Sequence, residues 1–223
     1  MAYSPPYAAA PRSARPWCAI LAVIAALVLL VSGCGVTAAW WFGAFTDHGR
    51  FHRVDACPLM PPDTLRHLVW DPVPDRDGES HPPRTLLGLG GGDLTAVCKW
   101  SSLIAGRDAP FRTVRVYAET RTADPPYQGA TQRARELFAT WRRGAGPQSG
   151  ARDEPGLAEE GFSLVDHMSI QIVFARTDIY DIHAKFRTSN LMVDLSARTH
   201  TRPSAELRAQ LVATARQIAD RLR

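Results

Sequence analysis

An uninterrupted apolar run from Trp17 to Phe45 constrains this chain more than any other feature. The run contains no Asp, Glu, Lys or Arg and is 29 residues long, which corresponds to about 43 Å as a helix. A hydrocarbon core of about 30 Å needs only about 20 such residues. Residues 17–45 are therefore predicted to form a transmembrane anchor. The Pro- and Ala-rich residues 1–16 that precede it are predicted to be a disordered cytoplasmic tail.

The flanks of the run indicate an orientation. Trp17 marks one end and Trp41 the other, as in the aromatic belts that meet lipid headgroups. Arg12 and Arg15 precede the run without acidic neighbours. Because cytoplasmic flanks are enriched in Lys and Arg, this favours a single-pass protein of the cell membrane with a cytoplasmic N-terminus. The remainder of the chain is then expected to be extracytoplasmic.

A second interpretation of the run stays open. Val31-Ser32-Gly33-Cys34 resembles a bacterial lipobox, in which Cys34 would carry a lipid after cleavage of the preceding residues. The apolar run, however, continues past Cys34 to Phe45, whereas mature lipoproteins usually enter a polar linker at once. An uncleaved span is the favoured interpretation and a lipoprotein anchor is the alternative. Both place the same domain on the same side of the membrane.

The cysteines after the anchor form one pair, Cys57 and Cys98. An even pair in an oxidising compartment predicts a disulfide. It would close a loop of about 42 residues and stabilise the fold by roughly 4 kcal/mol in the chain-entropy model. The alternatives are two free thiols, or a metal-binding pair that lacks its partners.

Composition limits the class of the remaining chain. Residues 46–56 are interpreted as a juxtamembrane linker, and residues 57–223 are long enough for one domain with a real core. The net charge of +4 is modest, and Lys99 and Lys185 are the only lysines beside many arginines. We interpret this bias as typical of a high-GC, actinobacterial genome. Since no arginine-rich stretch with interleaved aromatic residues occurs, nucleic acid is not an expected partner.

Alternating apolar residues predict the strands of this domain. The predicted strands lie at 94–102, 111–119, 168–174, 180–186 and 191–197. Helical spacing predicts a short helix after Pro61, a helix at 129–143 and a long amphipathic helix after Pro203.

The segments rich in Pro and Gly, 71–84 and 144–156, are interpreted as loops. Short connections between the strands favour antiparallel pairing. The predicted class is α+β, with one transmembrane helix followed by an antiparallel-sheet domain whose helices flank one face, and one disulfide.

Three stretches carry a family resemblance. They are Cys57-Pro58-Leu59 with Pro62 and Leu65, then Cys98-Lys99-Trp100, and finally Gly156-Leu157-Ala158-Glu159-Glu160-Gly161-Phe162. Together they resemble an actinobacterial family of small lipoproteins and membrane-anchored proteins of unknown function. More distantly, they are similar to extracellular sensor domains of receptor Ser/Thr kinases. The resemblance covers roughly residues 55–223 and implies a Cys57–Cys98 disulfide, an α+β domain and an extracytoplasmic location. It implies no activity.

Local residue groups do not predict a catalytic site. Asp166, His167 and Ser169 have the residue types of a hydrolase triad, but neighbouring residues in a strand point to opposite faces, so Asp166 cannot orient the ring of His167. The glycine-rich stretch 87–93 ends in Asp93, whose charge opposes a bound phosphate, and it is interpreted as a loop.

Metal-ligand candidates are equally incomplete. His48 and His52 are four residues apart but lack a convincing third ligand. The carboxylates of 71–77 are interrupted by prolines and Arg76, where a calcium loop needs glycine. No catalytic, metal or cofactor-binding residue is therefore assigned. The leading hypothesis is a non-enzymatic binding or sensor-like domain of the cell envelope, with an envelope protein or ligand as partner. The alternative is an envelope hydrolase or transferase whose site is assembled across strands.

Overall fold

The computed structural model describes residues 16–75, 92–102, 110–146, 149–172 and 175–223. The chain forms two compact units, Met1–Phe45 and Thr46–Arg223. Helix α1, Pro16–Trp41, makes up most of the described part of the first unit. Its segment Ile20–Trp41 is 22 residues long and apolar enough to cross a membrane.

The helix ends four residues before the apolar run does. Gly43 adopts a left-handed conformation with φ 77°, and its N–H donates to the carbonyl of Trp40 at 3.0 Å. This turn closes the helix, because a left-handed residue cannot continue it. The predicted anchor of residues 17–45 is thus a helix to Trp41 followed by an apolar turn.

The second unit is built on a seven-stranded antiparallel sheet with the order β1-β2-β3-β7-β6-β5-β4. The strands are β1 Val73–Asp75, β2 Leu94–Ser101, β3 Thr113–Thr120, β4 Arg152–Asp153, β5 Glu160–Ile172, β6 Ala175–Thr188 and β7 Leu191–Thr199. The antiparallel α+β class is confirmed. Strands β1 and β4 fall inside segments that were predicted as loops, because two or three residues are too few to show alternation.

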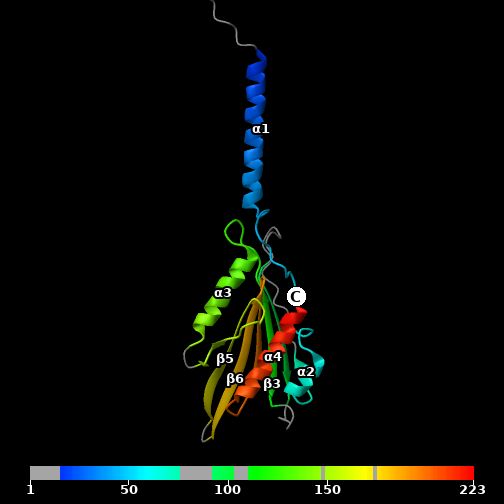
Figure 1. Ribbon diagram of the computed structural model, residues 1–223, viewed down its shortest axis with the longest axis vertical. Helices are drawn as coiled ribbons and strands as arrows, with labels where there is room; N and C mark the ends of the chain where they lie inside the picture. The colour runs from blue at the N-terminus through cyan, green and yellow to red at the C-terminus, as the bar shows by residue number, and fades with distance from the viewer. Residues whose placement is uncertain (1–15, 76–91, 103–109, 147–148, 173–174) are drawn as a thin grey trace, which may run out of the picture. The chain divides into compact units, whose positions relative to one another are not determined.

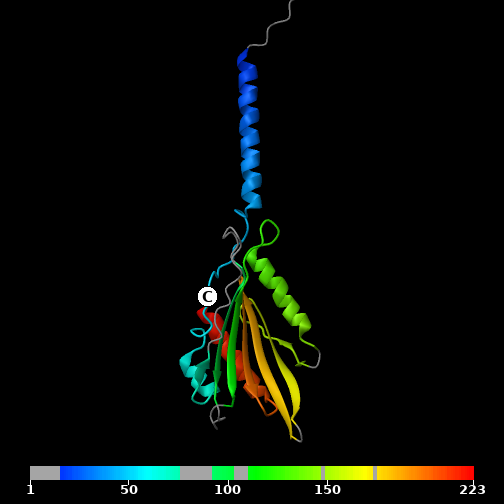
Figure 2. The same cartoon turned by 180° about the vertical axis from the view of Figure 1, so that it is seen from behind.

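Helices cover both faces of the sheet, so the prediction of a single covered face was wrong. Helices α2, Pro62–Leu68, and α4, Ala205–Arg221, pack on one face through the larger core cluster. Helix α3, Ala130–Gly144, packs on the other face through a smaller cluster (Figures 1 and 2). Strand β7 shows why the sequence did not reveal the second covered face. Its residue Val193 belongs to the larger cluster and the neighbouring Met192 to the smaller one. A strand covered on both faces is buried at nearly every position and loses its alternation.

The predicted helices at 129–143 and after Pro203 bury most of the residues that their spacing indicated, while Leu137, Trp141, Leu207 and Leu222 are only partly buried. On α3 the buried residues are Ala130, Ala134 and Phe138, and on α4 they include Leu211 and Ile218. Each large apolar side chain that is fully buried contributes about 1.5–3 kcal/mol of transfer free energy.

A disulfide between Cys57 and Cys98 joins the segment before α2 to the centre of β2, with 5.1 Å between the Cα atoms. This confirms the predicted pairing. Cys98 and Trp100 are both buried, as the alternation of their strand predicts.

The segment 46–56, predicted as a linker, packs against the domain. The carbonyl of Asp47 accepts the N–H of Ala130 at 2.7 Å. The side chain of Asn190 accepts from the N–H of Phe51 and donates to its carbonyl, both at 2.8 Å. A Cβ at Gly49 would lie 2.2 Å from Cγ of Asn190, so this close approach requires glycine. The domain therefore begins close to Thr46.

Candidate functional site

A cleft of about 550 Å³ opens on the α4 face of the sheet, at the end formed by β4, β5 and β6. We call it the arginine cleft. Its lining is formed by Ser149, Gly150, Arg152, Val165, His167, Tyr180, Arg202, Pro203, Ser204, Ala205 and Arg208.

Strand register brings the floor of the arginine cleft together. Arg152 of β4 pairs with Ser163 of β5, and His167 of β5 pairs with Tyr180 of β6. Residues opposite each other in antiparallel strands point to the same face, and so do residues two apart in one strand. Arg152, Val165, His167 and Tyr180 therefore share the face that carries α4. The segment before α4 adds Arg202, and the first turns of α4 add Arg208.

The charge of the arginine cleft is entirely positive. Three guanidinium groups line it, and no Asp or Glu occurs in the described lining. Among the residues that the structure describes, neither Arg152 nor Arg202 makes an ion pair, and both side chains are exposed. Uncompensated cations around a hollow attract an anion, and guanidinium groups match the geometry of carboxylates and phosphates.

Arg208 is the fixed member of the three. Its Nε donates to Ser163 Oγ at 2.8 Å and its Nη2 to the Ser163 carbonyl at 2.8 Å. Nη1 and Nη2 both donate to the carbonyl of Gly150 at 3.0 Å. These acceptors are neutral, so they orient the guanidinium without forming an ion pair, although Ser163 Oγ in turn donates to Glu154 Oε1 at 2.6 Å. Burial and, next, the positive charge of Arg152 lower the pKa of Arg208, while Glu154 partly offsets them. Arg208 and Arg152 therefore repel each other across this part of the cleft.

An aromatic pair forms another part of the lining. The rings of His167 and Tyr180 stack with 4.6 Å between centroids and 17° between planes. His167 Nε2 contacts Asp178 Oδ1 at 3.1 Å. Hydrogen bonds from His167 and then Ser169 lower the pKa of Asp178, which lies outside the lining. The pair presents a flat, partly exposed surface beside the arginines.

The segment before α4 adds polar groups to the cleft. Ser204 caps the helix by accepting the N–H of Leu207 on its side-chain oxygen at 3.2 Å. The first turn of a helix has backbone N–H groups without intrahelical partners and a partial positive charge. Glu206 lies in the same turn but is not part of the lining. The helix end thus adds to the field of the arginines.

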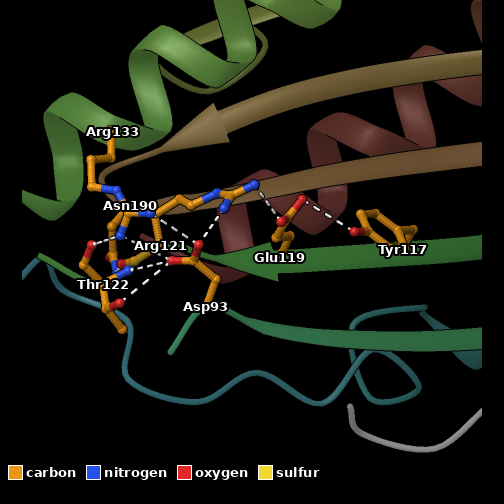
Figure 3. Close-up of polar contacts among 7 residues, drawn as sticks. All are labelled: Asp93, Tyr117, Glu119, Arg121, Thr122, Arg133 and Asn190. Atoms are coloured by element: carbon orange, nitrogen blue, oxygen red, sulfur yellow. Dashed lines mark hydrogen bonds and ion pairs between the residues drawn. The ribbon is translucent and has the colours of Figure 1, made fainter. Parts of the chain in front are cut away.

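One partly buried group of arginines elsewhere in the domain is compensated. Asp93 pairs with both Arg121 and Arg133, and Arg121 also pairs with Glu119 (Figure 3). Two cations thus meet two carboxylates. Burial, followed by the charge of Glu119, raises the pKa of Tyr117 to about 12, so this hydroxyl stays protonated and donates to Glu119. The network joins β3 to α3 and leaves no net charge for a ligand.

A second polar group lies on the opposite face of the sheet. His183 Nδ1 donates to Asp194 Oδ1 at 2.9 Å, and Lys185 Nζ lies 3.0 Å from Asp194 Oδ2. Burial alone would raise the pKa of Asp194, but the His183 hydrogen bond and the Lys185 charge outweigh it and hold the pKa below its ordinary value. Ser196 lies opposite His183 in the β6–β7 register. Both residues line a hollow of about 230 Å³.

The structure separates the candidate triad residues Asp166, His167 and Ser169. Asp166 lies 3.6 Å from Nε2 of His183, on the opposite face of the sheet from His167. Ser169 Oγ instead accepts from Arg176 Nε at 2.7 Å. His167 is the only member of the three that lines the arginine cleft.

The metal candidates gain no further ligands. Within the described ranges, no group of three or more His, Cys, Asp or Glu side chains is placed to hold a metal ion. Asp77 and residues 87–91 of the glycine-rich stretch lie outside those ranges. Cys34 is a free, exposed cysteine of α1.

No protein-family model, curated protein or solved structure matches this chain. The charge and shape of the arginine cleft are therefore the main indication of function. Sequence reasoning missed this cleft because its arginines come from separate segments, at positions 152, 202 and 208. The one local signal was the helix start after Pro203, which predicts the helix but not the partners gathered around it.

Proposed function

We propose that this protein is a membrane-anchored, extracytoplasmic, non-enzymatic domain of the bacterial cell envelope that binds an anionic ligand in the arginine cleft. The observation that carries the proposal is three guanidinium groups around one cleft without a carboxylate in its described lining. Such an arrangement is unfavourable in the empty domain, because like charges repel. An anion relieves this repulsion and adds charge-assisted hydrogen bonds.

The anchor and the disulfide support the location. One described helix has the length and apolarity to cross a membrane, and the disulfide suits an oxidising compartment. We propose a cytoplasmic N-terminus. Protease added to spheroplasts should then digest the C-terminal domain and spare an N-terminal tag. A protected domain would refute this orientation.

The form of the anchor has its own test. Our proposal is an uncleaved α1 in a protein of the actinobacterial family named above. Intact mass should therefore match the full chain. A lipid on Cys34, with residues 1–33 missing, would show the lipoprotein form instead.

Anion binding is tested with the full-length protein in uncharged detergent micelles. Calorimetric titration with inorganic phosphate at low ionic strength should give one saturable site. The double variant Arg152→Gln, Arg202→Gln removes both exposed cations. Hydrogen bonds to charged groups contribute about 1.5–3 kcal/mol each, and partial solvent exposure reduces this. The variant should therefore bind at least about tenfold more weakly, which corresponds to about 1.4 kcal/mol.

A matched control separates the site from the overall charge. Arg53 and Arg66 are exposed and lie outside the cleft. Changing both to Gln lowers the net charge by the same two units. This control should bind phosphate like the wild type. Equal weakening in both double variants would show that phosphate responds to net charge only, and the proposed site would be wrong.

An envelope hydrolase or transferase is the second candidate. The observation in its favour is the buried Asp194 that orients His183, with Ser196 opposite. Such a dyad can activate a hydroxyl nucleophile. If this candidate holds, wild-type protein should cleave p-nitrophenyl acetate faster than His183→Ala. Equal rates would exclude esterase activity at this group.

A further inference from the structure

We propose that the ligand of the arginine cleft is a phosphorylated sugar, bound by its phosphate at the arginines and by its ring against His167. This inference rests on the proposed function, because it names the chemical class of the anion held at the same site. It is carried by the juxtaposition of cations and an aromatic surface in one cleft.

The size of the cleft indicates more than a lone anion. Its volume of about 550 Å³ lies within the range of about 300–1,000 Å³ that is common for small-molecule sites. A phosphate beside Arg152 and Arg202 would leave much of this space unfilled. The ligand therefore carries a further group of substantial size.

The charge of the cleft favours a phosphate monoester as the anionic group. Arg152 and Arg202 are free of ion pairs within the described chain, so both can turn toward a ligand. Arg208 is held in place and adds its charge to the field. A phosphate monoester carries between one and two negative charges at neutral pH and offers three oxygens. A carboxylate offers one negative charge and two oxygens, so it matches the positive charge of three arginines less well.

The remaining walls favour a sugar ring. His167 is stacked on Tyr180, and its side chain is 47% exposed, so a further ring can lie against the flat pair. Apolar lining is limited to small side chains such as Val165 and Pro203, whereas Ser149 and Ser204 supply hydroxyl groups. An acyl chain would need a continuous apolar wall, whereas a hydroxyl-bearing ring suits a surface that is partly aromatic and partly polar.

The test compares ligands that share the phosphate and differ in the ring. Full-length protein in polyoxyethylene-ether micelles, which contain no sugar, is titrated with methyl phosphate. It is then titrated with a panel of 1-phosphates of glucose, galactose, mannose and N-acetylglucosamine. At least one hexose phosphate should bind tenfold or more tightly than methyl phosphate. His167→Ala should weaken hexose phosphate binding more than methyl phosphate binding and so remove this advantage, and a full advantage retained in this variant would overturn the role of His167. His67→Ala, an exposed histidine of α2, is the matched control and should change neither.

The outcomes separate this inference from the proposed function. Equal binding of methyl phosphate and every hexose phosphate would overturn the sugar assignment and leave the anion site standing. Tighter binding of phenyl phosphate or of glucuronate than of every hexose phosphate would also overturn it. Failure of all phosphates to bind would refute the proposed function itself.

Discussion

Loss of the disulfide should destabilise the domain by an amount that the loop length sets. Cys57 and Cys98 are 41 residues apart in sequence, and closing a loop of this size removes about 13 cal/mol/K of entropy from the unfolded chain. At 25 °C this corresponds to about 4 kcal/mol. In a domain of about 180 residues, each kcal/mol shifts the Tm by about 2–4 °C. The variant Cys57→Ala, Cys98→Ala should therefore melt about 8–16 °C lower. Alanine is preferred to serine in this variant, because serine at position 98 would bury a hydroxyl group without a hydrogen-bond partner.

Melting of the full-length protein in micelles measures this effect. Far-UV circular dichroism follows the sheet domain, and tryptophan fluorescence provides a second probe through the buried Trp100. Cys34→Ala, in the anchor, is the control and should leave the transition in place. A double variant that melts within about 2 °C of wild type would refute the loop-closure reasoning.

Three further variants test the charge groups of the domain. Asp93→Asn leaves two guanidinium groups without their shared carboxylate and should cost about 2 kcal/mol in urea unfolding. Arg187→Met removes a cation that is 1% exposed and paired with two glutamates, and should cost about 3 kcal/mol. The pKa of Asp194 is lowered in the fold from its ordinary 3.8. The ionised Asp194 carboxylate therefore makes its full contribution to the stability of the fold above pH 3.8, and this contribution is lost as the pH falls through the folded-state pKa. Asp194→Asn should destabilise at pH 7 and flatten the acid limb of the stability profile.

The helices and the half-buried strands were predictable because the apolar residues of each element recur with a single period along the sequence. The spacing of Ala134 and Phe138 on α3 predicts their burial, and Cys98 and Trp100 alternate inward on β2. Sequence patterns failed where both faces are covered. In β5, Phe162 and Leu164 pack toward α3, while the intervening Ser163 binds Arg208 of α4. Because a buried serine alternates here with apolar residues of the other face, the pattern looks like that of a half-exposed segment. The strand was therefore predicted to begin at 168, whereas it begins at Glu160.

The stretch 156–162 has a structural explanation. Gly156 and Ala158 take left-handed conformations with φ 77° and 56°, and Leu157 between them is buried in the larger core. The turn directs the two following glutamates to Arg187. The sequence shows Gly156 as a turn signal, but it shows neither the left-handed Ala158 nor the distant arginine that the glutamates bind.

The arginine cleft could not be predicted for a related reason. Arg152 comes from a two-residue strand, Arg202 from a loop and Arg208 from a helix. Their meeting depends on the β4–β5 register and on the packing of α4. The sequence around any one of these arginines does not show which distant segments it will meet.

The most direct test of an anion site in the arginine cleft is an anomalous difference map from crystals of the protein grown with tungstate. Tungstate is a tetrahedral dianion like phosphate and scatters strongly. We predict a peak inside the cleft between Arg152 and Arg202 that is lost in the double glutamine variant. An empty cleft at saturating tungstate, or peaks only elsewhere on the domain, would contradict the proposal.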